Sequence, residues 1–388
     1  MHHDRSIEMR ASQLAIETAE SVVRQTVSTR TWVVIGIALL ITAALIRYVG
    51  VPFACRLPEG FTSTQRLTGE YRALDPSTFD LGAPSSIDAQ RDTDVERTDG
   101  STAVIRSTTA LQLPSGPVTS VYHYAVDRTD FSQTPAPSGT KVKDQLGGMV
   151  ISRAVGADAD SFKVYNPALD KTQRMTFTGQ SEIHGRKAYG FSGTASGVIA
   201  DPQLAAPYQA AIAQMAKTGD GSTMPKLLLE MIASGLPARY SAGLNAVLPN
   251  LPDEVPIRFT IDDVTSMALD QQLGAPITLA AQQTTVLNVL VDFKLVPVLP
   301  LSMVSLHSTD ESATEAAQFM NANGWKLTVL GTYLPITLVS AAIVILLMAV
   351  TSRLTARRHR RGFTARDVGI HTRDEAHGPE HEHLELVP

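Results

Sequence analysis

The sequence is poor in cysteine, in charge and in catalytic motifs. Cys55 is the single cysteine, so no disulfide can form within the chain. Charged residues make up only 18% of the chain and the formal net charge is -5, so we expect no nucleic-acid partner. Serine-hydrolase, zinc-protease, dithiol and phosphate-loop spacings are absent. The sequence therefore predicts neither an enzyme nor a bound cofactor or metal.

Long apolar runs, in contrast, occur twice. The second run, residues 327–351, carries no charge, and about 20 apolar residues are enough to cross a hydrocarbon core of about 30 Å. The arginines that follow it are Arg353, Arg357, Arg358, Arg360, Arg361 and Arg366. Such clusters stay in the cytoplasm, which predicts a cytoplasmic C-terminus. A core helix of a soluble protein explains neither this length nor this flank.

The first run, residues 31–51, is uncharged until Arg47, whose side chain can reach the lipid headgroups. A cleaved signal peptide is the alternative. Roughly thirty residues precede the run and no small-residue cleavage site follows it, so we expect a retained anchor. The residues before Cys55 are also atypical of a lipoprotein. Arginines ahead of the run predict a cytoplasmic N-terminus.

These observations predict a plasma-membrane protein with both termini in the cytoplasm. Residues 1–30 form a cytoplasmic N-terminal helix or tail, and residues 31–51 and 327–351 are the transmembrane helices. Residues 52–326 form a periplasmic domain. Residues 352–388 form a tail that is first basic and then rich in histidine and acids. We interpret this tail as a solvated end, although histidine-rich tracts can bind metal.

The periplasmic part is predicted to be α+β. Segments rich in threonine, valine and tyrosine predict strands at 64–71, 102–111, 118–127, 161–165, 173–178 and 187–194. A helical insert follows at about 202–250, and strands return at 257–264, 267–270, 286–295 and 298–306. Pro297 predicts a bulge or an edge. A last helix is expected from Asp310 until Asn323 and Gly324. The predicted fold is an antiparallel curved sheet or half-barrel with a helical insert.

Acidic residues lie close together at two places in the predicted periplasmic domain. Asp92, Asp94 and Glu96 lack the glycine of a calcium loop, so a polar turn is expected there. Asp262 and Asp263 are interpreted as a turn or a strand end.

Apolar surface is the remaining candidate for function, because an acyl chain gains about 0.8 kcal/mol per buried CH₂. On the predicted sheet, Tyr122, Tyr124, Tyr189 and Phe191 are candidates to line a lipid groove. The candidate lid residues in the insert are Leu227, Leu228, Met231, Ile232 and Leu236. The alternative is a purely structural role, in which all of them are ordinary core residues.

Five short segments in this order resemble a known family. They are TQRLTG at 64–69, FKVYNP at 162–167, TFTG at 176–179, GRKAYGF at 185–191 and IDDVTS at 261–266. Between two apolar spans, they make the chain similar to the actinobacterial PorA-like membrane proteins over about residues 30–350. One departure is Ser266, where the family pattern has glycine in an expected turn.

The resemblance implies a lipid-binding accessory of envelope biogenesis in bacteria that contain mycolic acids, supporting polar growth. Implied partners are a membrane lipid or glycolipid such as trehalose monomycolate, and the RND-type mycolate exporter; lipoglycan maturation is the other implied role. Two helical spans do not fit a porin barrel, which crosses with many strands. Two alternatives remain open. One is a non-catalytic scaffold for a transporter or glycosyltransferase, and the other is a lipoglycan enzyme that uses His123, His184 and His307.

Overall fold

A computed structural model describes residues 30–217 and 219–367. The chain divides into two compact units. We call Pro52–Leu327 the β unit, and Met1–Val51 together with Thr328–Pro388 the helix unit. Most of the predicted N-terminal helix and the histidine-rich end of the tail lie outside the described residues.

Two helices, each lying mostly in the helix unit, are long and apolar enough to cross a membrane. One is Arg30–Ala54, which includes a π-helical turn, η1 (Ile46–Gly50), and α2 (Val51–Ala54). The other lies within the helical stretch Asp310–Thr355, which contains a second π-turn, η3 (Val329–Tyr333), and the start of α7 (Leu334–Asp367).

Small residues bring these two helices together. A Cβ atom at Gly36 would lie only 2.8 Å from Cγ of Leu346, so a larger residue at 36 would push the helices apart. The Arg47 guanidinium donates a hydrogen bond of 3.0 Å to the carbonyl oxygen of Gly331. Close contact through glycine is a common mode of helix pairing in membranes.

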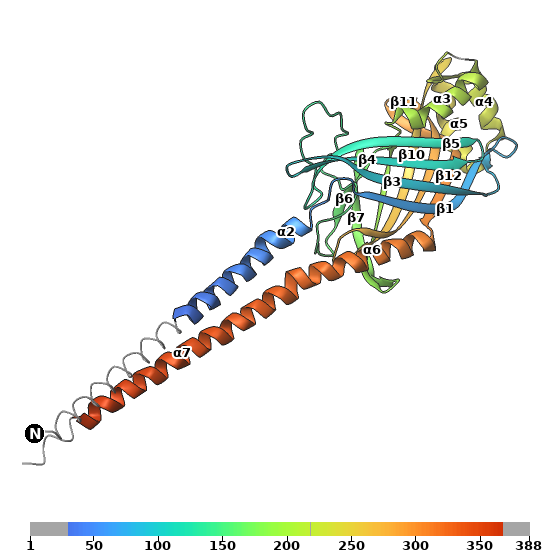
Figure 1. Ribbon diagram of the computed structural model, residues 1–388. Helices are drawn as coiled ribbons and strands as arrows, with labels where there is room; N and C mark the ends of the chain where they lie inside the picture. Colours follow the sequence, from blue (N-terminus) through green and yellow to red (C-terminus); the bar gives the residue numbers. More distant parts are fainter. Residues whose placement is uncertain (1–29, 218, 368–388) are drawn as a thin grey trace, which may run out of the picture. The chain divides into compact units, whose positions relative to one another are not determined.

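The β unit is built on one twelve-stranded antiparallel sheet that is strongly curved (Figure 1). Its strands are β1 (Thr62–Asp75), β2 (Asp80–Leu81), β3 (Ser85–Asp99), β4 (Thr102–Leu113), β5 (Gly116–Asp127), β6 (Phe162–Asn166), β7 (Lys171–Ile183), β8 (Arg186–Val198), β9 (Thr223–Pro225), β10 (Glu254–Asp270), β11 (Pro276–Val291) and β12 (Lys294–Ser308). The order is β5-β4-β3-β1-β12-β11-β10-β8-β7-β6, with β2 beside β1 and β9 beside β10. Since β5 and β6 do not pair with each other, the sheet is open, as the predicted half-barrel requires.

Local chemistry accounts for the strands and their turns. Along β10, buried residues alternate with more exposed ones from Val255 to Asp263, the pattern of a strand with one face on the core. The turn between β7 and β8 is formed by His184 and Gly185, whose φ angles are 47° and 77°. Two successive positive φ angles are typical of a type I′ hairpin turn.

Prolines shape β12. Pro297 lies opposite Asn288 and Pro300 lies opposite Val286, and the register between β11 and β12 shifts on both sides of Leu287. Proline has no N–H to donate, so it interrupts the ladder there. The bulge predicted at Pro297 is confirmed. β1 covers β12 only from Ser302 onward.

The helical insert consists of α3 (Pro202–Ala216), α4 (Lys226–Gly235), α5 (Ala238–Val247) and a 3₁₀ turn, η2 (Leu248–Asn250). Asp201 caps α3 by accepting a hydrogen bond of 2.8 Å from the backbone N–H of Gln203. The three helices gather at one end of the sheet (Figure 1). Leu229 and Leu244 are fully buried with Val289 and Val298 of the sheet, so the insert forms part of the largest core cluster.

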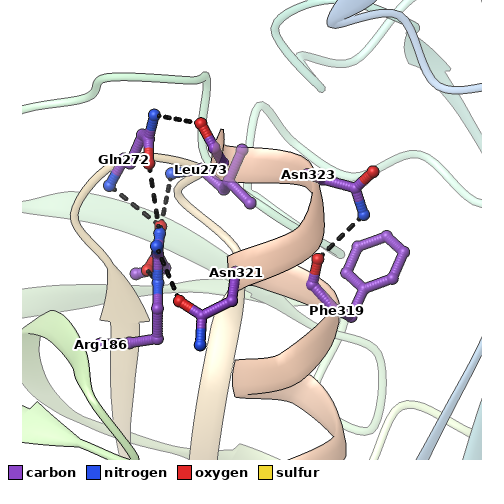
Figure 2. A network of polar contacts seen from close by, with 8 residues as sticks. Arg186, Gln272, Leu273, Phe319, Asn321 and Asn323 are labelled. Carbon is purple, nitrogen blue, oxygen red and sulfur yellow. Dashed lines mark hydrogen bonds and ion pairs between the residues drawn. The ribbon is translucent and has the colours of Figure 1, made fainter. Parts of the chain in front are cut away.

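A second contact surface joins α6 (Asp310–Thr328) to the sheet. Ala313 and Met320 of α6 pack against Ala188, Ala268 and Ile277. Beside them, Arg186 makes a bidentate ion pair with Asp270 through bonds of 2.7 and 2.8 Å. Figure 2 shows the Arg186 side chain between Gln272 and Asn321. Gln272 in turn donates to the carbonyl oxygen of Gly324 at 2.9 Å, so this network ties α6 to two sheet strands.

Several predictions of local structure are wrong. Residues 257–264 and 267–270, predicted as two strands, form the single strand β10, and the predicted strand 286–295 crosses the turn between β11 and β12. Residues 85–99, which include Asp92, Asp94 and Glu96, form the central strand β3 and not a polar turn. Asp262 and Asp263 lie inside β10. Ser266 also lies inside β10, so there is no turn for glycine to form. The last helix continues past Gly324 to Thr328, because Gly324 packs beside Gln272 and Arg186 instead of ending the helix.

Candidate binding cavity

The curvature of the sheet encloses a cavity of about 180 Å³ in the β unit. One wall comes from β1, β3, β4 and β5, and the other comes from β6, β10, β11 and the segment 149–151. The apolar lining residues are Met149, Val150, Ile151, Val164, Met267 and Leu279. Pockets for drug-sized ligands run from about 300 to 1,000 Å³, so this cavity has room for only part of a lipid.

Polar residues form the opposite wall in adjacent rows of the sheet. Arg91 of β3 lies directly between Gln65 of β1 and Thr109 of β4. In the adjacent row, Ser107 of β4 lies opposite Tyr122 of β5. All five side chains line the cavity. The cavity is therefore amphipathic, with a polar wall built by strand register.

Arg91 is the one lining residue that carries a charge at neutral pH. Its Nε donates to Oγ of Ser107 at 3.3 Å and its Nη2 donates to the carbonyl oxygen of Val150 at 3.0 Å. In the described part of the chain no carboxylate pairs with it, and Nη1 has no hydrogen-bond partner yet is not sealed from solvent. Burial lowers the pKa of Arg91, but arginine stays protonated in proteins. A positive charge thus faces the cavity without a counter-ion among the described residues.

Three tyrosines surround the same space. The rings of Tyr122 and Tyr124 are 6.4 Å apart, and those of Tyr124 and Tyr165 are 6.1 Å apart. The Tyr122 hydroxyl donates to Asp201 and the Tyr165 hydroxyl donates to Asp170. Burial and these hydrogen bonds raise the pKa of both phenols.

Tyr124 differs from its neighbours. Burial raises its pKa to about 12, with the charge of Arg91 acting in the opposite direction. Its hydroxyl makes no hydrogen bond with the described residues, and it is not among their sealed polar atoms. At neutral pH the cavity therefore offers two donors without a partner among the described residues, Nη1 of Arg91 and the Tyr124 hydroxyl.

Of the four predicted groove residues on the sheet, two line the cavity and two lie elsewhere. Tyr122 and Tyr124 line the cavity. Phe191 is buried in a core cluster with Met175 and Leu269, and Tyr189 packs edge-on against Phe177 at 5.9 Å between ring centres. Neither Tyr189 nor Phe191 lines the cavity.

The predicted lid residues also lie apart from this cavity. In α4, Leu227 and Met231 are 69% and 63% exposed, so they face solvent. Ile232 and Leu236 are buried in the largest core cluster, and Leu228 packs against it. None of the residues 202–250 lines the cavity, so the insert does not cover it. A role of these residues in lipid binding stays a prediction.

The three histidines of the β unit do not converge. His123 lies 3.4 Å from Glu96, and His184 lies 3.2 Å from Asp310. His307 is in β12, and none of the three lines the cavity. Within residues 30–217 and 219–367 no group of three or more His, Cys, Asp or Glu side chains is arranged to hold a metal.

Arg91 and Gln65 are among the cavity residues that the sequence did not predict. The sequence contains a cue for Arg91, because Ile87, Ala89 and Val95 recur with the period of a strand. These three side chains are buried in the structure, and Arg91 lies on the same inward-facing side of the strand. An arginine at an inward position of a strand is the cue that points to this wall.

The fold and site define a class: a protein with two candidate membrane-spanning helices and one antiparallel β unit that encloses an amphipathic cavity. The family described as porin PorA matches residues 29–351. The chain belongs to this family, which confirms the PorA part of the resemblance seen in the sequence. No curated protein matches the chain.

Solved structures give only remote similarities. A MaoC-like dehydratase from Phytophthora capsici is 10% identical, with 64% of this chain and 72% of that chain covered and a TM-score of 0.14. A Mycobacterium tuberculosis protein with a double hotdog fold is 12% identical, with 70% and 81% covered and a TM-score of 0.12. Alignments at these TM-scores do not define a shared fold.

Proposed function

We propose that the chain is a membrane-anchored, non-catalytic protein whose β unit holds part of a lipid in the amphipathic cavity. The observation that carries the proposal is the cavity itself, with Met267 and Leu279 among its apolar side chains and Arg91 on its polar wall. Burying about six methylene groups there would contribute roughly 5 kcal/mol. The rest of the lipid would stay outside, because the volume is about 180 Å³.

The proposal places the β unit in the periplasm and both ends of the chain in the cytoplasm. It rests on the two apolar helices and on the arginines that follow the second one, such as Arg353 and Arg357. The resemblance drawn from the five sequence segments implies an envelope that contains mycolic acids. A trehalose mycolate is accordingly the lipid that we propose first, and the RND-type mycolate exporter is the proposed partner.

Native mass spectrometry of the full chain, gently extracted in detergent, tests the lipid. We expect a retained lipid of defined mass in the wild type. Leu279→Trp should release it, because the indole fills the apolar part of the cavity. Leu295→Trp is the matched control, since Leu295 lies on β12 away from the cavity and is 37% exposed. An empty wild-type protein, or equal lipid content in all three, would contradict the proposal.

A scaffold for a transporter or glycosyltransferase is the second candidate. The observation that favours it is the pair Leu227 and Met231, which are exposed one helical turn apart on α4. Exposed apolar side chains of this kind are typical of contact surfaces between proteins. Under this proposal Leu227→Ser with Met231→Ser abolishes function in cells and leaves lipid content unchanged. Full function of the double variant would remove the scaffold from consideration.

A further inference from the structure

We propose that the polar wall of the cavity is an oxyanion site, so that the bound lipid carries a single carboxylate or phosphate head on an apolar chain. The inference rests on the proposed function, because it concerns the same cavity. It narrows the ligand to an anionic amphiphile, and in doing so it ranks such a lipid ahead of the neutral trehalose mycolate named above.

The first step is the state of Arg91. Its two hydrogen bonds go to a hydroxyl and a carbonyl group, which hold the guanidinium in place but do not neutralise it. Nη1 is accessible and has no partner among the described residues. A guanidinium is suited to the two oxygens of a carboxylate or phosphate through parallel N–H donors.

The second step is the balance of donors and acceptors around it. The hydroxyl of Tyr124 is a further donor without a partner among the described residues. The nearby carboxylates are already engaged: Asp201 accepts from Tyr122 and Gln203, and Asp170 accepts from Tyr165. The wall therefore presents a cation and a hydroxyl donor, and a bound oxyanion would satisfy both groups.

The third step is the position of the apolar side chains. Val150 lies next to the guanidinium, since its carbonyl group accepts from Arg91, and its side chain belongs to the cluster of Ile105 and Tyr124. Met267 and Leu279, from β10 and β11, line the same cavity. A head group bound at Arg91 thus has apolar lining within the same small volume, which is the arrangement that an amphiphile requires.

Titration calorimetry on the full chain in nanodiscs tests the inference with decanoate, decyl phosphate and decan-1-ol. We expect the wild type to bind at least one of the two anions about tenfold or more tighter than the alcohol, the gain that a charged hydrogen bond supplies. Decanoate and decyl phosphate separate a carboxylate head from a phosphate head. In Arg91→Gln this preference should disappear while the alcohol binds as before.

Arg106→Gln is the matched control, because Arg106 lies on β4 and is half-exposed in ion pairs with Asp94 and Glu96. It should keep the full anion preference, and circular dichroism should show the same sheet signal in both variants. Equal binding of acid and alcohol by the wild type, or an unchanged preference in a folded Arg91→Gln protein, would overturn the oxyanion site but leave the lipid cavity intact. Failure of all three probes, together with an empty native mass spectrum, would instead refute the proposed function.

Discussion

Replacing Arg186 by methionine should be one of the most damaging single changes in the β unit. Asp270 is 1% exposed and Arg186 is 14% exposed, so their bidentate pair is largely removed from water. The variant keeps the volume of the side chain but leaves a sealed carboxylate with only the backbone N–H groups of Gln272 and Leu273 as donors. Removing one partner of such a pair typically costs about 3–5 kcal/mol.

The reverse change should cost less. Asp270→Asn keeps an acceptor for the two backbone N–H groups, and the guanidinium can still reach Gln272 at 3.4 Å and Asn321 at 3.3 Å. We expect a loss of about 1.5–3 kcal/mol. Urea unfolding of the full chain in detergent, followed by far-ultraviolet circular dichroism, measures both. Fluorescence of Trp325 on α6 reports whether this helix detaches first.

The matched control is Arg66→Met. Arg66 pairs with Glu315 of the same helix at 3.0 Å, but the two side chains are 44% and 52% exposed. An exposed pair is worth about 0–1 kcal/mol. If Arg186→Met is no more destabilising than Arg66→Met, the Arg186 network is hydrated in solution and does not fasten α6 to the sheet.

Two further predictions concern the sheet. Burial raises the pKa of Asp263 above its ordinary value of 3.8. Ionisation of this carboxyl therefore lowers the free energy of unfolding above its folded-state pKa and has no effect below 3.8. Asp263→Asn should be more stable than wild type at about pH 7, and urea unfolding at several pH values should show this difference vanish in acid. Gly69→Ala places a Cβ atom 1.8 Å from the carbonyl oxygen of Ser305, which forces β1 away from β12. In the same assay this variant should lose about 1–3 kcal/mol of stability or more. The control Gly219→Ala meets open space and should leave stability nearly unchanged.

Sequence patterns predicted most of the elements because their residues have strong local preferences. Threonine, valine and tyrosine favoured strands at β4 and β5, and Pro297 indicated the bulge of β12. Strand β3 was missed because its exposed face carries Asp88, Asp92 and Asp94, residues typical of turns. Its inward face is held by pairing with β1 and β4, which a local pattern does not reveal.

The site was less predictable because it depends on curvature. Gln65, Arg91 and Met267 come from distant parts of the chain, and only the folded sheet brings them to one cavity. The insert shows the same limit on a smaller scale. In α4, Leu227 and Leu229 point in different directions because successive residues turn by about 100°, so the run of leucines cannot all face the sheet. The packing of Leu229 and Ile232 decides that Leu227 and Met231 are exposed.

The prolines of β12 have a consequence for the unfolded chain. The segment 294–306 is rich in leucine and valine and carries a single charge, at Lys294. Without its prolines, such a composition would be typical of segments that assemble into amyloid-like fibrils. Pro297 and Pro300 each lack the N–H that a stacked copy of the strand would need. In a newly made chain, the segment that becomes β12 can therefore remain unpaired until β11 and β1 pair with it, with a reduced risk of aggregation. Replacing both prolines should increase aggregation during synthesis before it changes the folded structure.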